Sequence, residues 1–387
     1  MDAAFFASAA PPIDFSKLGM RDEREDVLNF LFFKLILGLS LSAMADTDPT
    51  PSAIRNSMLN WYDVHARALP WRAKPFTRPY PYHVWMSEVM LQQTTVGAVK
   101  SYFEKFIDIW PSVQDLANAS QDDVMREWAG LGYYSRARNL HKCAQIIANE
   151  FDGKFPSDIK RLKLLPGIGD YTSAAIASIA FDKPEVVIDG NIERVISRVY
   201  RIQTPLPLSK PIIKDFAKPL FVGDNTDRPS CFAQSLMDLG ATICTPKSPK
   251  CTICPIKDYC EGYEQGDAAI YPLKLKKAKI PEKHALAYIY VSDGKVGIER
   301  REDRGMLGGM VGFPTSEWVA IEENLPDSTH EVLESHKVRH VFTHFALTLY
   351  PVIIHQKNNT MHPYGEMDGI GLPTLFKKLW NMVRLQL

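Results

Sequence analysis

The sequence predicts a multidomain protein of 387 residues, in which an all-α region precedes a smaller α+β domain. Apolar residues recur at helical spacing through residues 52–242, and from residue 285 runs rich in β-branched residues replace this pattern. The chain is also too long for one average hydrophobic core. We expect four segments: an N-terminal extension at 1–51, a helical domain at 52–265, a basic linker at 266–284 and a final domain at 285–387.

The composition is that of a globular protein, with 45% hydrophobic and 23% charged residues and a formal net charge of zero. A zero net charge does not favour a strong general attraction to nucleic acid. Residues 1–51 carry eight acidic and four basic side chains, a net charge of −4, so the remaining residues carry +4. The part of the chain after residue 51 is therefore mildly basic.

The N-terminal extension contains an apolar run at 31–43 and an Ala-Met-Ala sequence that resembles a signal cleavage site. Lys34 interrupts this run, the preceding flank has no net positive charge, and the run is too short to span a bilayer. We therefore do not expect export. We expect the extension to be disordered or to lie upstream of a natural start at Met44.

Helices are predicted throughout the helical domain. The first starts after Ser52 and ends at a Leu-Pro-Trp-Arg sequence, residues 69–72. A short helix is predicted to begin at Ser120, which has Asp123 at the third position of a capping box. The other predicted helices lie at 82–94, 96–106, 172–181, 192–199, 211–222 and 230–242.

The helix at 82–94 carries an acidic residue among apolar ones. By helical spacing, Glu88 shares a face with Val84 and Leu91. A glutamate in a helix is usually a solvated edge residue, but the flanking Met and Trp residues indicate partial burial. Burial raises a carboxyl pKa toward the range that a general acid needs.

The sequence LPGIGDY at 165–171 predicts the hairpin of a helix-hairpin-helix. Gly167 and Gly169 allow a tight turn that exposes backbone N–H groups just before a helix starting near Asp170, and such donors bind phosphate without reading sequence. An ordinary glycine-rich turn would explain Gly-x-Gly alone, but an apolar helix follows at once. Asp189 then lies between an apolar run and the helix at 192–199, where a carboxylate is placed for chemistry.

The loop GLGYYSRAR at 130–138 combines aromatic residues with arginines. This mixture suits stacking on bases and contacts with phosphates. Packing of the aromatic residues on a helix start explains it equally well.

Four of the six cysteines follow the pattern Cys244-x6-Cys251-x2-Cys254-x5-Cys260. Zinc sites usually show two close pairs of ligands, so a single C-x2-C with wider flanking gaps favours a four-thiolate [4Fe-4S] cluster in a reducing compartment. The loop between the first two ligands carries Lys247 and Lys250, which either contact phosphate or remain solvated. We expect the remaining cysteines, Cys143 and Cys231, to be ordinary core residues.

The linker is rich in lysine, including Lys274, Lys276 and Lys277. After it, a β-hairpin is predicted from strands at 285–291 and 296–300 joined by Asp293 and Gly294. A further strand is predicted within 341–354, where 342–344 interrupt the alternation.

These features together resemble the MutY-type adenine DNA glycosylases of the helix-hairpin-helix superfamily, which includes endonuclease III. The resemblance covers most of residues 52–387. It implies a base-excision repair hydrolase that cleaves the N-glycosidic bond of adenine opposite 8-oxoguanine or guanine in double-stranded DNA and leaves an abasic site. It also implies a helical catalytic module, a [4Fe-4S] module and a C-terminal MutT-like (Nudix) fold. The motifs that carry it are SEVMLQQT (87–94), GLGYYSRAR (130–138), LPGIG (165–169), IDGN (188–191) and the cysteine set.

The resemblance also implies roles for residues. Glu88 is the catalytic acid and Asp189 the second carboxylate, with Tyr171 and Asn191 in the same catalytic set. The apolar flank of Glu88 is expected to keep it protonated, whereas the polar helix start is expected to keep Asp189 ionised. Residues implied to contact DNA are Gln93 and Tyr133 as wedges, Gly167 and Gly169 in the hairpin, Lys247 and Lys250, and Phe342, Thr343 and His344 for 8-oxoguanine.

Tyr171 departs from the endonuclease III pattern, in which the second residue after Gly-x-Gly is a lysine that forms a Schiff base. Without that amine we expect a monofunctional glycosylase, with an endonuclease III-like glycosylase/lyase as the alternative. A different alternative is a non-enzymatic DNA-binding redox sensor that uses the cluster, but such a protein would have no use for the carboxylates of Glu88 and Asp189. A third alternative is a nucleotide hydrolase that uses the C-terminal domain, but residues 308–325 lack the Arg-Glu and Glu-Glu arrangement of Nudix hydrolases, so we interpret this domain as a binding module. We further expect a monomer in the bacterial cytoplasm, associated with the nucleoid and not with a membrane.

Overall fold

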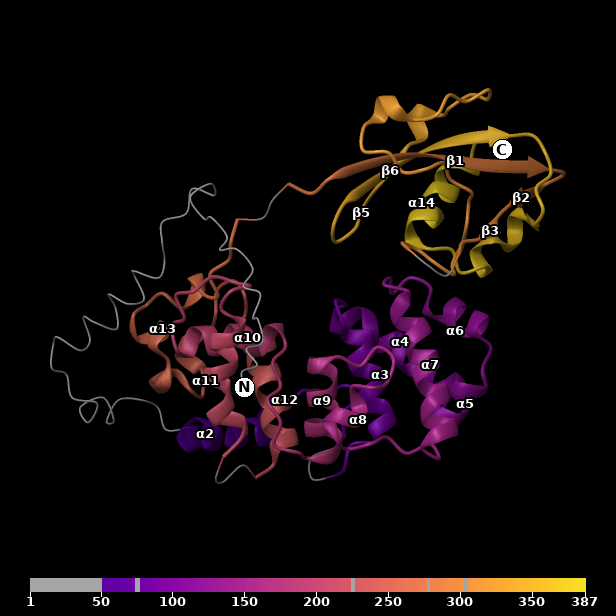
Figure 1. Cartoon of the computed structure of the whole chain (residues 1–387). Helices are drawn as coiled ribbons and strands as arrows, with labels where there is room; N and C mark the ends of the chain where they lie inside the picture. Colours follow the sequence, from indigo (N-terminus) through magenta and orange to yellow (C-terminus); the bar gives the residue numbers. More distant parts are fainter. Residues whose placement is uncertain (1–50, 74–76, 224–226, 277–278, 303–304) are drawn as a thin grey trace, which may run out of the picture. The chain divides into compact units, whose positions relative to one another are not determined.

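The computed structural model describes residues 51–73, 77–223, 227–276, 279–302 and 305–387 (Figure 1). The expectations for the N-terminal extension up to residue 50, and for Lys277, lie outside the described residues. No helix within the described ranges is long and apolar enough to cross a membrane.

The region expected to be helical contains helices throughout. Each predicted helix is present, and additional helices lie between them. The helices are α2 (Pro51–His65), α3 (Pro81–Leu91), α4 (Val96–Ile109), α5 (Val113–Asn118), α6 (Gln121–Trp128), α7 (Ser135–Glu150), α8 (Ile159–Leu162), α9 (Asp170–Phe181), α10 (Gly190–Val199), α11 (Lys210–Phe221), α12 (Pro229–Thr242) and α13 (Glu261–Glu264).

Local sequence explains several helix ends. Ser120 caps α6 by accepting a hydrogen bond from the backbone of Asp123, as predicted, and Ser112 forms a complete capping box with Asp115 at α5. Helix α3 ends at Leu91, earlier than predicted, because Gln93 has a left-handed φ of +55° that cannot continue a helix.

The helices pack into two hydrophobic cores. One is built mainly on α4 to α7, and the other on α2 and α10 to α12. Helices α3 and α9 supply buried residues to both cores: Val84 and Ala174 belong to the second, whereas Trp85 and Ile176 belong to the first. These two apolar helices therefore lie between the cores and place side chains such as Glu88 deep inside the helical region.

The C-terminal part forms a five-stranded sheet in the order β5-β6-β1-β2-β7. Strand β1 (Glu282–Ser292) runs parallel to β6 (Ala346–Ile354), and β5 (Val338–Val341) runs antiparallel to β6. The strands β2 (Lys295–Gly297) and β7 (Met361–Pro363) complete the sheet. Helix α14 (Thr374–Val383) buries Phe376 and Trp380 in the same core as sheet residues such as Ile289.

Two predictions for this domain need correction. The strand predicted at 296–300 is divided: β2 ends at Gly297, and β3 (Glu299–Arg300) pairs with β4 (Val311–Gly312) in a separate sheet. Strand β1 begins at Glu282, so the last three residues of the predicted linker are strand residues that pair with β6. The turn at Asp293 and Gly294 is confirmed, with φ values of +52° and +68°.

Candidate active site

A cavity of about 1030 Å³ lies where α3, α9 and the start of α10 meet. Its wall includes all four residues of the predicted catalytic set: Glu88, Tyr171, Asp189 and Asn191. Gln93 and the hairpin glycines Gly167 and Gly169 line it as well. The fold therefore brings together residues as far apart in sequence as Glu88 and Asn191, around a cavity large enough for a nucleobase.

Glu88 is buried on α3, with 6% of its surface exposed. The hydroxyl of Tyr171 donates a hydrogen bond to Glu88 Oε2 over 2.7 Å. Burial and the nearby Asp189 raise the pKa of Glu88 to about 7, although the Tyr171 hydrogen bond and Arg72 oppose the rise. The expectation of a raised carboxyl pKa is confirmed, and its main cause is burial.

Asp189 is the N-cap of α10. Its Oδ1 accepts hydrogen bonds from the backbone N–H of Asn191 at 3.0 Å and of Ile192 at 2.7 Å, and its Oδ2 accepts one from Asn191 Nδ2 at 2.8 Å. Burial raises the pKa of Asp189, while these hydrogen bonds and Arg194 oppose the rise. The predicted helix-start position is confirmed, but the carboxylate is more buried than expected, and directed donors rather than solvent stabilise its charge.

Arg194, one turn into α10, was not identified from the sequence. Its Nη2 donates to Asn191 Oδ1 at 3.0 Å and to Gly240 O at 2.6 Å, and its Nε donates to Cys244 O at 2.8 Å. Arg194 thereby fixes the amide of Asn191, whose other end donates to Asp189. The sequence feature that could have identified Arg194 is its position in a predicted helix that is buried on nearly all sides, where an arginine is unusual.

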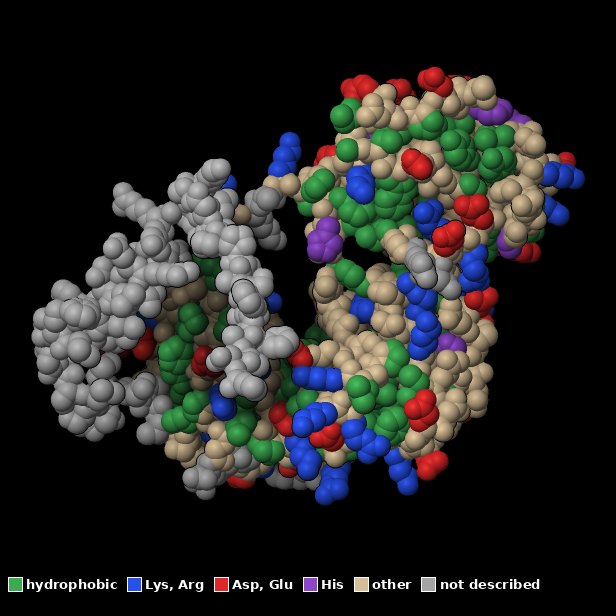
Figure 2. Space-filling model, viewed as in Figure 1, with side chains coloured by type: hydrophobic (Ala, Val, Ile, Leu, Met, Phe, Trp, Pro, Cys, Tyr) green, Lys and Arg blue, Asp and Glu red, His purple; other side chains and the backbone are tan. Residues whose placement is uncertain are grey.

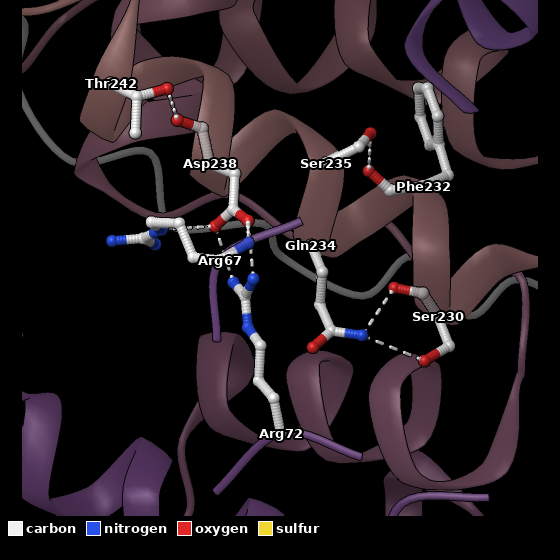
Figure 3. A network of polar contacts seen from close by, with 8 residues as sticks. All are labelled: Arg67, Arg72, Ser230, Phe232, Gln234, Ser235, Asp238 and Thr242. Carbon is white, nitrogen blue, oxygen red and sulfur yellow. Dashed lines mark hydrogen bonds and ion pairs between the residues drawn. The ribbon is translucent and has the colours of Figure 1, made fainter. Parts of the chain in front are cut away.

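A second group that the sequence did not reveal surrounds Asp238 on α12 (Figure 3). This fully buried carboxylate accepts two hydrogen bonds from Arg72, at 2.6 and 2.7 Å, and one from Arg67 Nε at 2.6 Å. Figure 3 shows both guanidinium groups turned toward Asp238, with Gln234 one turn away on the same helix. Because the bidentate contact fixes the Arg72 guanidinium, Arg72 and Gln234 present ordered polar atoms to the cavity that they line.

The hairpin residues occupy an exposed turn before α9. Gly167 has a φ of +78°, and a Cβ at this position would lie 2.9 Å from Asn139 Cβ, so the turn requires glycine on two counts. Gly169 is the N-cap of α9 and supplies no side chain to its N–H groups. Figure 2 shows Lys and Arg side chains gathered around α8, which precedes this turn and includes the exposed Lys160 and Arg161.

The wedge and lesion-contact candidates are brought to another cavity, of about 480 Å³, which Gln93, Tyr133, Phe342, Thr343 and His344 all line. The residues at 342–344 belong to the turn that joins β5 to β6, closed by a hydrogen bond from Phe342 N to Phe345 O. The hydroxyls of Tyr133 and Thr343 lie 3.0 Å apart within hydrogen-bonding distance. The side chains of Tyr133, Thr343 and His344 are exposed.

The four clustered cysteines line a separate small cavity. Arg198, which is 1% exposed, donates from Nη1 to Cys244 Sγ at 3.2 Å. No group of side chains in the described ranges converges tightly enough for a single metal ion. A cubane cluster does not need such convergence, because each thiolate binds a different iron. The four thiols, the apolar walls and the sulfur-directed donor therefore fit a [4Fe-4S] cluster.

The other predicted site residues near this module, Lys247 and Lys250, are exposed between the first two cluster ligands and do not line the active-site cavity. Cys143 is fully buried, as predicted, whereas Cys231 is only partly buried.

Three family models match the chain. A model for HhH-GPD superfamily base excision DNA repair proteins matches residues 86–220, and one for the iron-sulfur binding domain of endonuclease III matches residues 244–260. A NUDIX domain model matches residues 285–382. The [4Fe-4S] cofactor and the MutT-like fold of the C-terminal domain, both expected from the sequence, are thereby confirmed.

Relatives match across most of the chain. An adenine DNA glycosylase of Buchnera aphidicola (subsp. Schizaphis graminum) is 34% identical, over 84% of this chain and 97% of the relative. That of Mus musculus is 32% identical, over 86% of this chain and 78% of the relative. Among solved structures, a thermostable thymine-DNA glycosylase is 29% identical, with 56% of this chain and 97% of that chain covered and a TM-score of 0.49. The chain belongs to the MutY-type adenine DNA glycosylases, which are hydrolases of base-excision repair.

Proposed function

We propose that this protein is a monofunctional glycosylase that removes adenine mispaired with 8-oxoguanine or guanine in double-stranded DNA and leaves an abasic site. The observation that carries the proposal is the pair Glu88 and Asp189, which line one cavity in different hydrogen-bonding environments. In this proposal residues 52–265 perform catalysis, 266–281 form the linker and the domain that begins with β1, residues 282–387, recognises the lesion. Action as a monomer and association with the nucleoid stay predictions.

Glu88 is the proton donor in the proposed mechanism. With a pKa of about 7, a large fraction of this carboxyl is protonated at neutral pH. Burial and the nearby carboxylates raise the pKa of Tyr171, which therefore stays neutral and donates to one oxygen of Glu88. The other oxygen of Glu88 is left to carry the acidic proton toward the base.

Asp189 stabilises the positive charge that develops on the sugar. As the bond from the sugar to adenine breaks, its electron pair leaves with the base and the proton from Glu88 neutralises it. The sugar becomes oxocarbenium-like beside the Asp189 carboxylate, and water then adds to it. The proton released by that water restores Glu88. Because three donors hold Asp189 in place, its charge needs little reorganisation during the reaction.

Arg72 and Gln234 are suited to recognise the flipped base. Arg72 is held by Asp238, and Gln234 is held by hydrogen bonds from its Nε2 to Ser230 (Figure 3). A base must leave the stack to reach Glu88, and ordered polar groups then read its hydrogen-bonding edge. The hairpin at Gly167 and Gly169, together with Lys247 and Lys250, would hold the DNA backbone through phosphates.

The monofunctional assignment rests on Tyr171, which occupies the position of the Schiff-base lysine and is already hydrogen-bonded to Glu88. Within the described ranges no lysine lines the active-site cavity. Cys244, Cys251, Cys254 and Cys260 would hold the cluster, which would cross-link this part of the chain, whereas base cleavage as proposed uses side chains of the helical domain and water.

The test measures base release and strand scission on duplexes that carry adenine opposite 8-oxoguanine, guanine, cytosine or thymine. We expect adenine release with the first two partners, strand cleavage only after added alkali, and no covalent adduct with borohydride. Release of another base would overturn the substrate assignment. A full-yield borohydride adduct would instead establish the glycosylase/lyase alternative.

A further inference from the structure

The two proposed wedge residues share an unusual backbone conformation. Gln93 has a φ of +55° and Tyr133 a φ of +48°, values that residues other than glycine rarely adopt. Such a backbone conformation is unfavourable and persists only where the surrounding structure holds it in place. The two turns come from separate loops, after α3 and before α7, so a side chain that contacts both would fix them relative to one another.

Arg136 on α7 contacts both turns. Its Nη1 donates to the carbonyls of Val89 and Met90, at 3.0 and 2.7 Å, in the last turn of α3. Its Nη2 donates to Thr94 Oγ1 at 3.0 Å, directly after Gln93. The same nitrogen also lies 3.2 Å from the carbonyls of Leu131 and Gly132, directly before Tyr133.

The side chain of Arg136 is almost fully enclosed, with 8% of the residue exposed. Its guanidinium carbon lies 5.4 Å from the centre of the Tyr133 ring and 5.1 Å from that of Trp128. Nε has no hydrogen-bond partner within the described ranges, so the fork is held entirely through its two terminal nitrogens. Burial lowers the pKa of Arg136 to about 10, which leaves it charged at neutral pH.

We propose that Arg136 is a positioning residue that sets Gln93 and Tyr133 at the spacing needed to open the base stack. This inference rests on the proposed function, because it assumes that both side chains enter the duplex. Arg136 does not line the active-site cavity, so in this proposal it acts only through these turns. A lysine cannot replace it, because a single ammonium group cannot contact all five acceptors that the two terminal nitrogens of the guanidinium reach.

The predicted signature is a dependence on how firmly the target adenine is stacked. Arg136→Lys should lower single-turnover excision of adenine opposite guanine on the order of tenfold to a hundredfold, as expected for misplaced positioning groups. Adenine opposite a tetrahydrofuran abasic analogue has no pairing partner and is more easily extruded. For that substrate the loss should be under about threefold, because unpaired bases need less help to leave the stack.

A second readout does not depend on bond cleavage. A 2-aminopurine beside the target adenine should brighten when the wild-type protein opens the stack, and Arg136→Lys should reduce this rise. Arg126→Lys is the matched control: Arg126 lies on α6, before the same loop, and its side chain is 48% exposed. If Arg136→Lys destabilises the fold, Thr94→Val removes one acceptor on the Gln93 side and should show a weaker form of the same signature.

A double-mutant cycle separates this inference from the proposed function. In a Gln93→Ala/Tyr133→Ala background, Arg136→Lys should cause no further loss, because the residues that it positions are gone. Equal losses on paired and unpaired substrates, or a full additional loss in that background, would overturn the role of Arg136. If the background variant itself opens the stack like wild type, the proposed wedges fail, whatever Arg136 does.

Discussion

The active-site cavity and the turn between β5 and β6 differ in how they hold their polar groups. In the cavity, Glu88 and Asp189 are largely buried, and each has protein hydrogen-bond donors directed at it. In the turn, Thr343 and His344 are exposed, and the Thr343 hydroxyl lies within hydrogen-bonding distance of the hydroxyl of Tyr133. Burial shifts pKa values and holds charge for chemistry, whereas exposed groups stay free to contact a partner.

Substitution of the buried acid should give the largest effect. Glu88→Gln keeps the shape and can still accept the Tyr171 hydrogen bond, but it has no acidic proton to donate. We expect adenine excision to fall by roughly 10²- to 10⁴-fold, the range for general acid catalysis, while binding to the lesion duplex is retained. Single-turnover kinetics with a parallel Kd measurement tests this. A near wild-type rate would show that the proton comes from another group.

Asp189→Asn should come next. The amide preserves the volume of the side chain but removes the negative charge beside the sugar, and its NH₂ group cannot accept the hydrogen bonds that Asn191 and Ile192 donate to the carboxylate. A loss of about 10² to 10³ in the single-turnover rate is expected, as for other preorganised electrostatic groups. Asp182→Asn is a suitable control, because Asp182 lies exposed after α9 and outside the cavity. Equal losses in both variants would contradict a specific role for Asp189.

The exposed turn should give a smaller and more selective effect. 8-Oxoguanine differs from guanine by an N7–H donor and a C8 carbonyl, so a hydrogen bond to Thr343 or His344 should separate the two bases by no more than the roughly 1 to 3 kcal/mol of a bidentate base contact. The double substitution Thr343→Ala/His344→Ala should therefore erode the preference for adenine opposite 8-oxoguanine over adenine opposite guanine. Excision of the latter should persist. If the preference is unchanged, lesion recognition resides elsewhere in the chain.

The smallest effect concerns stability. The pKa of Glu88 is raised from 4.5 to about 7 in the folded protein, so the folded state binds the proton more tightly than the unfolded state. The stability associated with this group is complete below pH 4.5 and is lost as the pH rises through 7. At pH 8, Glu88→Gln should therefore unfold at a higher temperature than wild type. Its free energy of unfolding should exceed that of wild type by no more than roughly 3 kcal/mol. If Glu88→Gln is less stable than wild type at pH 8, the folded protein does not raise the pKa of Glu88 as proposed.

The sequence predicted the features that are encoded locally. The helices, the Ser120 cap, the hairpin glycines and the helix-start position of Asp189 each follow from residues within a few positions of one another. The raised pKa of Glu88 was also predictable, because its neighbours on α3 are large and apolar.

Interactions between distant segments were not predictable in the same way. Asp238 and Arg72 are 166 positions apart, and only the packing of α12 against the loop before α3 reveals their pairing. The same holds for Arg136, whose acceptors on α3 lie 46 and 47 positions away. The divided strand at 296–300 shows a further limit, because two- and three-residue strands contain too few positions for an alternating pattern.

The most direct test is the pH dependence of single-turnover adenine excision, measured for the wild type and for Glu88→Gln at saturating protein. A donor with a pKa of about 7 predicts a wild-type rate that is highest below pH 7 and falls about tenfold per pH unit well above it. The residual rate of Glu88→Gln should show no such decline. A wild-type rate that is constant from pH 6 to 9, or a decline that persists in Glu88→Gln, would contradict the assignment of Glu88 as the acid.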